Sequence, residues 1–364
     1  MKIGILTRRF GYNMGSTLQA LAMVEMLRSL GHNVEVIDYD ETSGHPMWKL
    51  RPVIEHLMYK LNIPPSGMKR EYLKHRMRQE KKFEEFERTY LPLTSGIYKN
   101  AKSLAKISEH YDKIVVGSDQ IWNPMLYDPI FFGNFISIDQ LYKFLPYAPS
   151  IGVNSSALIN PDQKKLLRRL PVLSCREMEG ADVLTEITGH KIPVVLDPTL
   201  MVNTEFWTNI ANSHKVSEIT DNYLLTYFLG KVSEKAQKEI EQLASTRNLR
   251  VINIAMFNKP NSIKPNSHLK ELGPGEFLYV IKNASYIATD SFHATVFSWI
   301  FNRDFRVFLR FDQGDPKNQN SRIHTLLDIL GCKNNIYGFN STVPESSKVE
   351  NHRDSSFQYL VENL

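Results

Sequence analysis

The sequence predicts an α/β protein made of two doubly wound, Rossmann-like domains that face each other across a cleft. Short apolar runs of strand length alternate with helix-length segments, which is typical of parallel sheets covered by helices. This alternation restarts after Pro198. The chain has 364 residues, more than twice the length of a typical domain of about 150 residues. Two domains are therefore expected. In such domains ligands bind beyond the carboxyl ends of the parallel strands.

The first half opens with a βαβ unit. Residues 2–7 and 34–39 are apolar runs, and between them apolar side chains recur at helical spacing from 18 to 30. The further strands and helices expected in this half lie at 111–117, 145–151, 161–170, 172–174, 176–189 and 194–196. A helical insert over about 46–92 interrupts the series. We predict an N-terminal domain over residues 1–198.

The second half repeats the alternation. Its expected strands and helices lie at 223–228, 234–246, 250–255, 274–283, 286–289, 293–301 and 305–309. We predict a C-terminal domain over residues 199–343. The polar tail over 344–364 is either a crossover helix or a loose segment.

Composition excludes several classes of protein. Hydrophobic residues make up 42% and charged residues 23% of the chain, with a mean hydropathy of −0.31, which is typical of an ordinary globular protein. The sequence lacks an apolar run of membrane-spanning length and a signal peptide, so we expect a cytoplasmic protein. Cys175 and Cys332 are too few for a disulfide scaffold and have no metal-ligand spacing. We expect no metal and no bound cofactor.

The net charge of +5 is concentrated in one segment. Residues 49–91 hold eleven Lys or Arg against six Glu, which accounts for the whole excess. A basic helix over 69–90 can meet nucleic acid, an anionic membrane surface or a phosphorylated, lipid-linked substrate. Glutamates interleaved with the basic residues favour a solvated helix face instead. We expect no nucleic-acid partner and leave open a contact with the inner face of the membrane.

Three loops that follow apolar runs carry polar side chains. The first, residues 11–17, joins a strand to a helix whose N-terminus attracts anions. Its glycines match neither a dinucleotide-binding fingerprint nor a phosphate-binding P-loop, and they can equally serve a tight turn.

The second loop contains Ser118, Asp119, Gln120 and Trp122. Carboxylate and amide groups can bind sugar hydroxyls, and an indole offers a flat face to a pyranose ring. The structural alternative is a helix cap with Trp122 in the core.

The third loop contains Asp290, Ser291 and His293 at the start of a helix. Imidazole beside a carboxylate at a strand end favours anion contact or proton transfer near neutral pH. Any of five arginines near predicted element ends can grip a phosphate: Arg176, Arg303, Arg306, Arg310 and Arg322.

Several stretches together resemble the polysaccharide pyruvyl transferase family over nearly the whole chain. They are residues 13–20, 36–39, 116–123, 147–152, 174–177, 196–200 and 289–297, among them Val116-Gly117-Ser118-Asp119-Gln120 and Thr289-Asp290-Ser291-Phe292-His293. The resemblance implies a fold similar to that of B-type glycosyltransferases, with the N-terminal domain on the acceptor side of the cleft and the C-terminal domain on the donor side. It also implies an enzyme of exopolysaccharide biosynthesis that transfers pyruvate from phosphoenolpyruvate onto two hydroxyls of a hexose, in a surface polysaccharide or its lipid-linked precursor, as a cyclic ketal.

The motif match places the family's acid/base histidine at His293, and we assign Asp119 as a second catalytic residue. The residues assigned to donor or substrate binding are Asn13, Gly15, Gln19, Ser118, Gln120, Trp122, Arg176, Asp290, Ser291 and Thr295. The chain departs from the family in having Ser291 where many members have an arginine. Arg8, Arg9 and Arg176 are the first candidates to replace it.

Two other functions stay open at this point. A nucleotide-sugar-dependent glycosyltransferase of similar architecture would place a diphosphate on the helix at His293. A non-catalytic glycan-binding relative would keep the fold without donor binding.

Overall fold

The computed structural model describes residues 1–9, 11–41, 70–219, 222–255, 265–312, 315, 318–339 and 346–364. In the helix that begins at residue 70, side chains are described from residue 74 onward. The insert predicted over about 46–92 lies outside the described residues up to position 69. Its remainder is helix α3 (Arg70–Tyr90) followed by an extended segment.

The N-terminal half forms a four-stranded parallel sheet in the order β2-β1-β3-β4. Its strands are β1 (Lys2–Leu6), β2 (Asn33–Val36), β3 (Lys113–Val116) and β4 (Phe144–Pro146). Its helices, besides α3, are α1 (Met14–Ser29), α4 (Ala101–Ser108), α5 (Pro161–Arg169) and α6 (Met178–Thr188). Helix α1 buries 13 of its 16 residues, so it lies inside the molecule instead of on one face.

The C-terminal half forms a five-stranded parallel sheet in the order β7-β6-β5-β8-β9. Its strands are β5 (Tyr223–Tyr227), β6 (Arg250–Ile254), β7 (Ser267–Leu269), β8 (Tyr286–Thr289) and β9 (Asp304–Val307). The helices of this part of the chain are α7 (Thr204–Ser213), α8 (Glu234–Thr246), α9 (Pro274–Lys282), α10 (Phe292–Ile300), α11 (Ser321–Leu330) and α12 (Val349–Asn363). The predicted fold class, two Rossmann-like α/β domains facing a cleft, is confirmed.

Short 3-10 helices connect the longer elements. They are η2 (Pro124–Leu126), η3 (Pro129–Phe132), η4 (Ile138–Lys143), η5 (Ser156–Leu158), η6 (Pro198–Leu200) and η7 (Lys333–Asn335).

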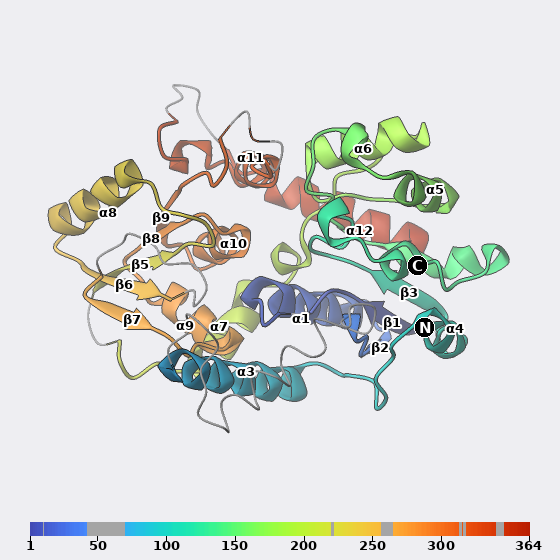
Figure 1. The fold of residues 1–364 in the computed structure, drawn as a ribbon, viewed down its shortest axis with the longest axis horizontal. Coiled ribbons are helices and arrows are strands. Elements are labelled where there is room, and N and C mark those ends of the chain that lie inside the picture. The colour runs from blue at the N-terminus through green and yellow to red at the C-terminus, as the bar shows by residue number, and fades with distance from the viewer. Residues whose placement is uncertain are drawn as a thin grey trace.

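The strand order fixes where ligands can bind. In the first sheet β1 lies between β2 and β3, and in the second β5 lies between β6 and β8. At such a switch point the connecting loops diverge and leave a crevice beyond the carboxyl ends of the strands. Figure 1 shows the two sheets on opposite sides of the molecule, with α1 and α10 between them. The crevices of both sheets therefore open onto the space at the N-termini of these two helices.

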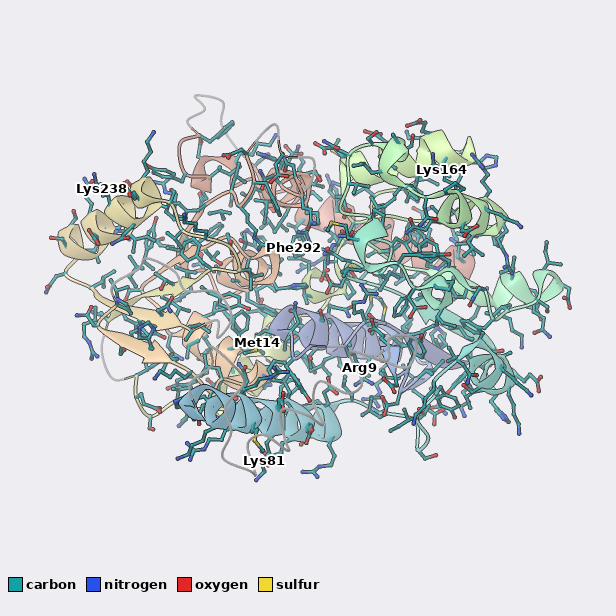
Figure 2. All side chains as sticks on the ribbon, in the orientation of Figure 1. Arg9, Met14, Lys81, Lys164, Lys238 and Phe292 are labelled. Carbon is teal, nitrogen blue, oxygen red and sulfur yellow. The ribbon has the colours of Figure 1, made fainter. Side chains whose placement is uncertain are left out.

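The central position of these helices is visible in the side chains. Met14 and Phe292, in the first turns of α1 and α10, are 4% and 9% exposed. Figure 2 shows both residues in the middle of the molecule, whereas Lys81, Lys164 and Lys238 lie at its periphery. The main hydrophobic core runs through α1, α9 and α10 and so joins the two sheets.

Two helices cross between the halves. The C-terminal tail forms α12, in which the Tyr359 hydroxyl donates to the carbonyl of Pro146 at 2.8 Å and the Ser356 hydroxyl accepts from the N–H of Leu196 at 2.9 Å. Helix α3 packs against α9, where Lys82 pairs with Glu276 at 2.7 Å. Helices α12 and α3 therefore add contacts between the two halves to those of the shared core.

Two strands predicted in the first half are wrong. Residues 172–174 form no strand, and the run at 194–196 contributes one bridge between Cys175 and Val194. Side chains replace the backbone ladder here, because the Ser174 hydroxyl accepts from the N–H of Ala148 and donates to the carbonyl of Pro146. The strand predicted over 145–151 likewise ends at Pro146, beyond which the chain turns.

Candidate active site between the two sheets

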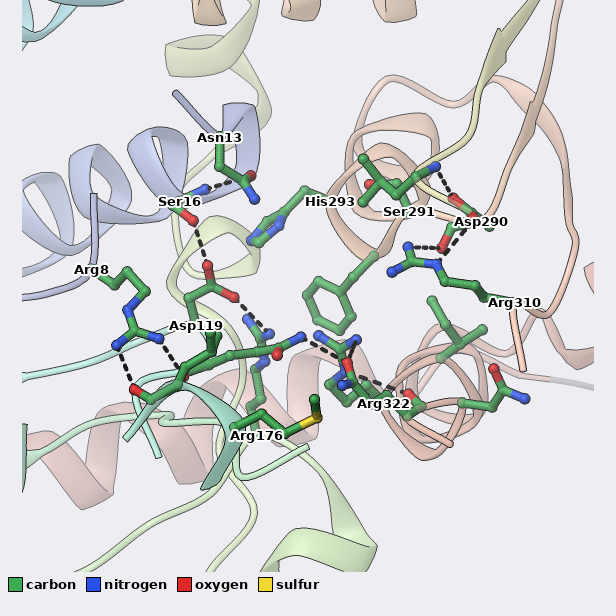
Figure 3. Close-up of a pocket in the computed structure, with 18 of the residues that line it drawn as sticks. Arg8, Asn13, Ser16, Asp119, Arg176, Asp290, Ser291, His293, Arg310 and Arg322 are labelled. Atoms are coloured by element: carbon green, nitrogen blue, oxygen red, sulfur yellow. Dashed lines mark hydrogen bonds and ion pairs between the residues drawn. The ribbon is translucent and has the colours of Figure 1, made fainter. Parts of the chain in front are cut away.

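The two switch points meet at a cavity of about 580 Å³. Both halves of the chain line it, as Figure 3 shows. The polar and charged residues of its wall are Arg8, Asn13, Ser16, Glu41, Asp119, Gln120, Asp128, Arg176, Asp290, Ser291, His293, Arg310, Gln319, Asn320 and Arg322. The three loops that the sequence singled out therefore all contribute to one pocket.

The N-terminus of α1 forms the first part of this wall. Asn13 caps the helix, since its side-chain oxygen accepts from the N–H groups of Gly15 at 2.9 Å and Ser16 at 3.3 Å. Gly15 brings the helix backbone against the imidazole of His293, and a β-carbon at this position would overlap that ring. The glycine is needed for this close approach.

Asp119 links α1 to a buried arginine. It accepts from the Ser16 hydroxyl at 2.5 Å and pairs with Arg176 at 3.2 Å. Burial alone would raise the pKa of Asp119, but the charges of Arg176 and His293 and the Ser16 hydroxyl hold that pKa below its ordinary value. Asp119 is therefore an ionised carboxylate at the pocket wall.

Beneath the pocket lies a second carboxylate, Asp197, which is fully buried. It accepts from Arg176 at 2.7 Å, from the Ser118 hydroxyl at 3.1 Å and from the Thr199 hydroxyl at 2.6 Å. Burial opposes its charge, yet His293 and Arg176 hold the pKa of Asp197 far below its ordinary value. The sequence analysis did not assign Asp197 to the site. Its signal was its place directly after the apolar run 194–196.

His293 reaches the pocket from the first turn of α10. Its Nε2 lies 3.7 Å from Asp197, and its side chain is 9% exposed. Within the part of the chain that the structure describes, this buried nitrogen has no hydrogen-bond partner. Ser291 caps the helix by accepting from the N–H of Ala294 at 3.4 Å. The imidazole is thus positioned by a helix, with its buried Nε2 near the carboxylate of Asp197. Imidazole is the side chain that most readily exchanges a proton near neutral pH.

Asp290 organises the opposite wall. Its carboxylate accepts from the N–H groups of Leu229 at 2.7 Å and Gly230 at 2.8 Å, and it pairs with Arg310 at 3.0 Å. This residue therefore fixes the loop after β5 and aims Arg310, while its own oxygens are occupied.

Besides Gly15, which contacts His293, three predicted binding residues lie behind the pocket wall instead of on it. The N–H of Ser118 donates to Gln19 at 2.8 Å, and Gln19 in turn donates to the Thr7 hydroxyl at 2.7 Å. Thr295 donates to the carbonyl of Ser291 at 2.9 Å. All three are buried. They hold the loops that present Asp119 and Ser291.

Trp122, another predicted binding residue, lies in a hydrophobic core cluster and not on the pocket wall. It is fully buried, its Nε1–H donates to the carbonyl of Phe131 at 2.9 Å, and its ring stacks on Phe132. An indole enclosed in this way offers no face to a sugar, so the structural alternative holds for this residue. Met125 and Leu126 supply apolar surface to the pocket instead.

Some of the candidate arginines line the pocket and others lie outside it. Arg8, Arg176, Arg310 and Arg322 line the pocket. Arg9 pairs with Asp38 and Glu87 outside it. Arg303 and Arg306 also lie elsewhere, where each donates to a backbone carbonyl.

The residues of α3 whose side chains the structure describes, 74–90, do not line the pocket. Several of its basic side chains are paired instead: Arg76 with Glu80, Lys81 with Glu85, Lys82 with Glu276, and Arg78 with Glu271. This helix packs along the second half of the chain.

Across the described ranges, His, Cys, Asp and Glu side chains do not gather in threes in a way that could hold a metal ion. None of the described helices is both long and apolar enough to cross a membrane.

The family model of polysaccharide pyruvyl transferase matches residues 13–310 of this chain. No curated protein matches the sequence of this chain.

Solved structures similar to this chain include a UDP-GlcNAc 2-epimerase from Neisseria meningitidis bound to UDP-GlcNAc, with 12% identity, coverage of 100% of this chain and 92% of that one, and a TM-score of 0.49. An Anabaena protein in complex with UDP and glucose is 9% identical, with coverage of 100% and 96% and a TM-score of 0.46. An E. coli heptosyltransferase with ADP is 11% identical, with coverage of 100% of both chains and a TM-score of 0.38. These three TM-scores are below 0.5, so the fold is defined by the two parallel sheets described above.

Proposed function

Because this chain belongs to the polysaccharide pyruvyl transferase family, a family of transferases, we propose that it moves pyruvate from phosphoenolpyruvate onto two hydroxyls of a hexose as a cyclic ketal. The cavity of about 580 Å³ has the volume of a typical small-molecule site and suits a three-carbon donor beside one sugar ring.

The observation that carries the proposal is the position of His293. Its Nε2 is buried without a hydrogen-bond partner among the described residues and lies 3.7 Å from Asp197, in a pocket lined by four guanidinium groups. Guanidinium groups suit the phosphate and carboxylate of the donor, and an imidazole placed among them can take part in proton transfer. The pocket thus combines a proton donor with an anion clamp.

The chemistry requires both parts. A proton is delivered to the methylene carbon of phosphoenolpyruvate, and a sugar hydroxyl forms a bond to the adjacent carbon. The bond from that carbon to the phosphate oxygen then breaks, with its electron pair leaving on phosphate, and a second hydroxyl closes the ketal. One hydroxyl proton replaces the proton that moved to carbon, and the other leaves with phosphate. We assign the first proton transfer to His293.

Asp119 is the proposed base. Its carboxylate is held ionised, and a carboxylate has about four acceptor positions, of which Ser16 and Arg176 occupy two. The remaining positions suit a hydroxyl whose proton is removed as it attacks.

The acceptor is proposed to be a glycan of a surface polysaccharide or its lipid-linked precursor, met in the cytoplasm at the inner face of the membrane. Met125 and Leu126, which line the pocket, are 63% and 39% exposed. Apolar surface at the rim suits a pyranose face or the start of a lipid linker. Comparing a free oligosaccharide with its lipid-linked form as acceptors tests this part.

The test of the function is incubation of the purified chain with an acceptor and either phosphoenolpyruvate or nucleotide sugars. We expect release of inorganic phosphate and gain of an acid-labile pyruvate ketal on the glycan with phosphoenolpyruvate alone. Release of nucleotide from a nucleotide sugar, with no phosphate released from phosphoenolpyruvate, would overturn the proposal in favour of glycosyl transfer. Heat-inactivated protein serves as the control.

A further inference from the structure

We infer that Arg322 is the principal phosphate-binding residue of this pocket, the group that holds the phosphate of the donor. The inference rests on the proposed function for the identity of that donor. It starts from a difference between Arg322 and the three other guanidinium groups of the pocket.

Three of the four arginines already have carboxylate partners. Their ion pairs are Arg8 with Glu41 at 2.8 Å, Arg176 with Asp197 at 2.7 Å, and Arg310 with Asp290 at 3.0 Å. Arg322 is the exception: within the described ranges, its hydrogen bonds run to amides instead of carboxylates. Its Nη2 donates to the side-chain oxygen of Gln319 at 2.8 Å. A phosphate can therefore reach Arg322 without breaking an existing ion pair.

The surroundings make this unpaired charge unfavourable. Burial, followed by the nearby positive charge of Arg176, lowers the pKa of Arg322 to about 10, although the carboxylates of Glu177 and Asp119 act in the opposite direction. A guanidinium withdrawn from water without a counter-charge is destabilising, and an anionic ligand removes that cost. Arg322 thus has the carboxylates of Glu177 and Asp119 in its surroundings but none bonded to it among the described residues, and a bound oxyanion would supply that contact.

The side chain of Gln120 contacts the guanidinium of Arg322 from the other side of the cleft. With its amide oxygen turned toward Arg322, Gln120 accepts from Nη2 at 3.0 Å. Gln120 belongs to the loop after β3, whereas Arg322 lies on α11. An amide oxygen is a weaker partner than a phosphate, which binds a guanidinium through two parallel charged hydrogen bonds. Donor binding would exchange or supplement this contact and draw on groups from both halves of the chain.

The N-terminus of α11 adds to the same attraction. Arg322 lies in the first turn of this helix, and Asn320, at the capping position, makes no side-chain cap bond. Its amide donates instead to the carbonyl of Phe311 at 2.6 Å. Uncapped N–H groups and the helix dipole favour an anion at this end. Figure 3 shows Arg322 and Arg310 on the same side of the pocket, facing Arg176 and Asp119.

The test compares Arg322→Gln with wild type and with Arg88→Gln, which removes an exposed guanidinium of α3 outside the pocket. The probes are inorganic phosphate, pyruvate and phosphoenolpyruvate, each in thermal unfolding. We expect phosphate and phosphoenolpyruvate to protect the wild type and Arg88→Gln. Arg322→Gln should lose the protection by phosphate and raise the KM for phosphoenolpyruvate by about 10- to 100-fold.

The unliganded melting temperature guards against a folding artefact. Removing an unpaired charge beside Arg176 should leave it unchanged or raise it. A lower melting temperature in Arg322→Gln would instead assign the guanidinium to stability and overturn the inference. So would undiminished protection by phosphate, or a loss confined to pyruvate, which would assign Arg322 to the donor carboxylate.

The same data separate the two proposals. Turnover of phosphoenolpyruvate with equal phosphate binding by wild type and Arg322→Gln would overturn the role of Arg322 and leave the function standing. Phosphate protection that depends on Arg322, without any transfer from phosphoenolpyruvate, would support the anion site and overturn the function.

Discussion

The imidazole of His293 lies directly on the backbone of Gly15, across the boundary between the two halves of the chain. The first turns of α1 and α10 meet at this contact (Figure 3). The candidate acid therefore belongs to one half while the surface that fixes its position belongs to the other, so the site is complete only when the two halves pack as described here.

Gly15→Ala should displace the His293 ring, because a β-carbon at this position overlaps it. A misplacement of about 1 Å can lower turnover by about 10²-fold, so we expect a loss of that size in kcat. Gly96→Ala is the matched control, since its β-carbon would approach nothing closer than 3.6 Å. Equal activity of the two variants would show that the ring tolerates the shift.

His293→Gln should keep most of the affinity for phosphoenolpyruvate and lower turnover by about 10² to 10⁴, the usual contribution of an acid catalyst. Thermal protection measures donor binding, and phosphate release measures turnover. Near-normal turnover with weakened protection would assign His293 to the anion clamp and leave the acid unidentified.

Asp197→Asn should destabilise the protein at neutral pH by about 1 to 3 kcal/mol, because it removes the nearest carboxylate of the buried Arg176, at 2.7 Å, and leaves Asp119, at 3.2 Å, as its closest charge partner. The pKa of Asp197 is depressed in the folded state, so its contribution is present above the unfolded value of about 3.9 and is lost as pH falls below it. The difference from wild type should hold from about pH 5 to 8 and shrink below about pH 4. Urea unfolding across this range measures it.

The control for this variant is Asp304→Asn, which breaks a pair with Arg247 of similar length, 2.6 Å, whose two side chains are 64% and 45% exposed. Surface pairs contribute little, so its stability should stay near that of wild type. A comparable loss in both variants would contradict a special role for burial at Asp197.

Lys82→Glu should lower the melting temperature more than Lys81→Glu. Lys82 pairs with Glu276 of α9 at 2.7 Å, whereas Lys81 lies beside Glu85 on its own helix at 3.6 Å and is 75% exposed. Both substitutions change the net charge equally. Only Lys82→Glu places a second negative charge beside Glu276, at the contact between α3 and α9. Equal melting temperatures would show that the α3–α9 contact adds nothing to stability.

Trp122→Phe should leave the KM for the acceptor unchanged and reduce stability by about 1 to 3 kcal/mol, because the buried carbonyl of Phe131 loses its donor. Acceptor titration and urea unfolding measure the two effects. A raised KM with unchanged stability would return the indole to a role in sugar binding.

The sequence by itself determined the order and type of most elements. The helix expected over residues 234–246 is α8 with the same bounds, and the strands expected at 223–228 and 286–289 are β5 and β8. Periodicity and capping residues are local properties of the chain, so they can be read without knowing what packs against each segment. The three loops at the cleft were predictable for the same reason, because each follows an apolar run.

Only the tertiary structure decided which side chains meet. It brought Asp197 within 3.7 Å of His293, placed Gly15 under the same ring, enclosed Trp122 in the core and left Arg322 facing amides across the cleft. Each of these outcomes depends on contacts between segments far apart in the chain, whose separation no periodicity encodes. Burial and charge pairing, the properties that distinguish a structural polar group from an available one, exist only once the two sheets and their helices have packed together.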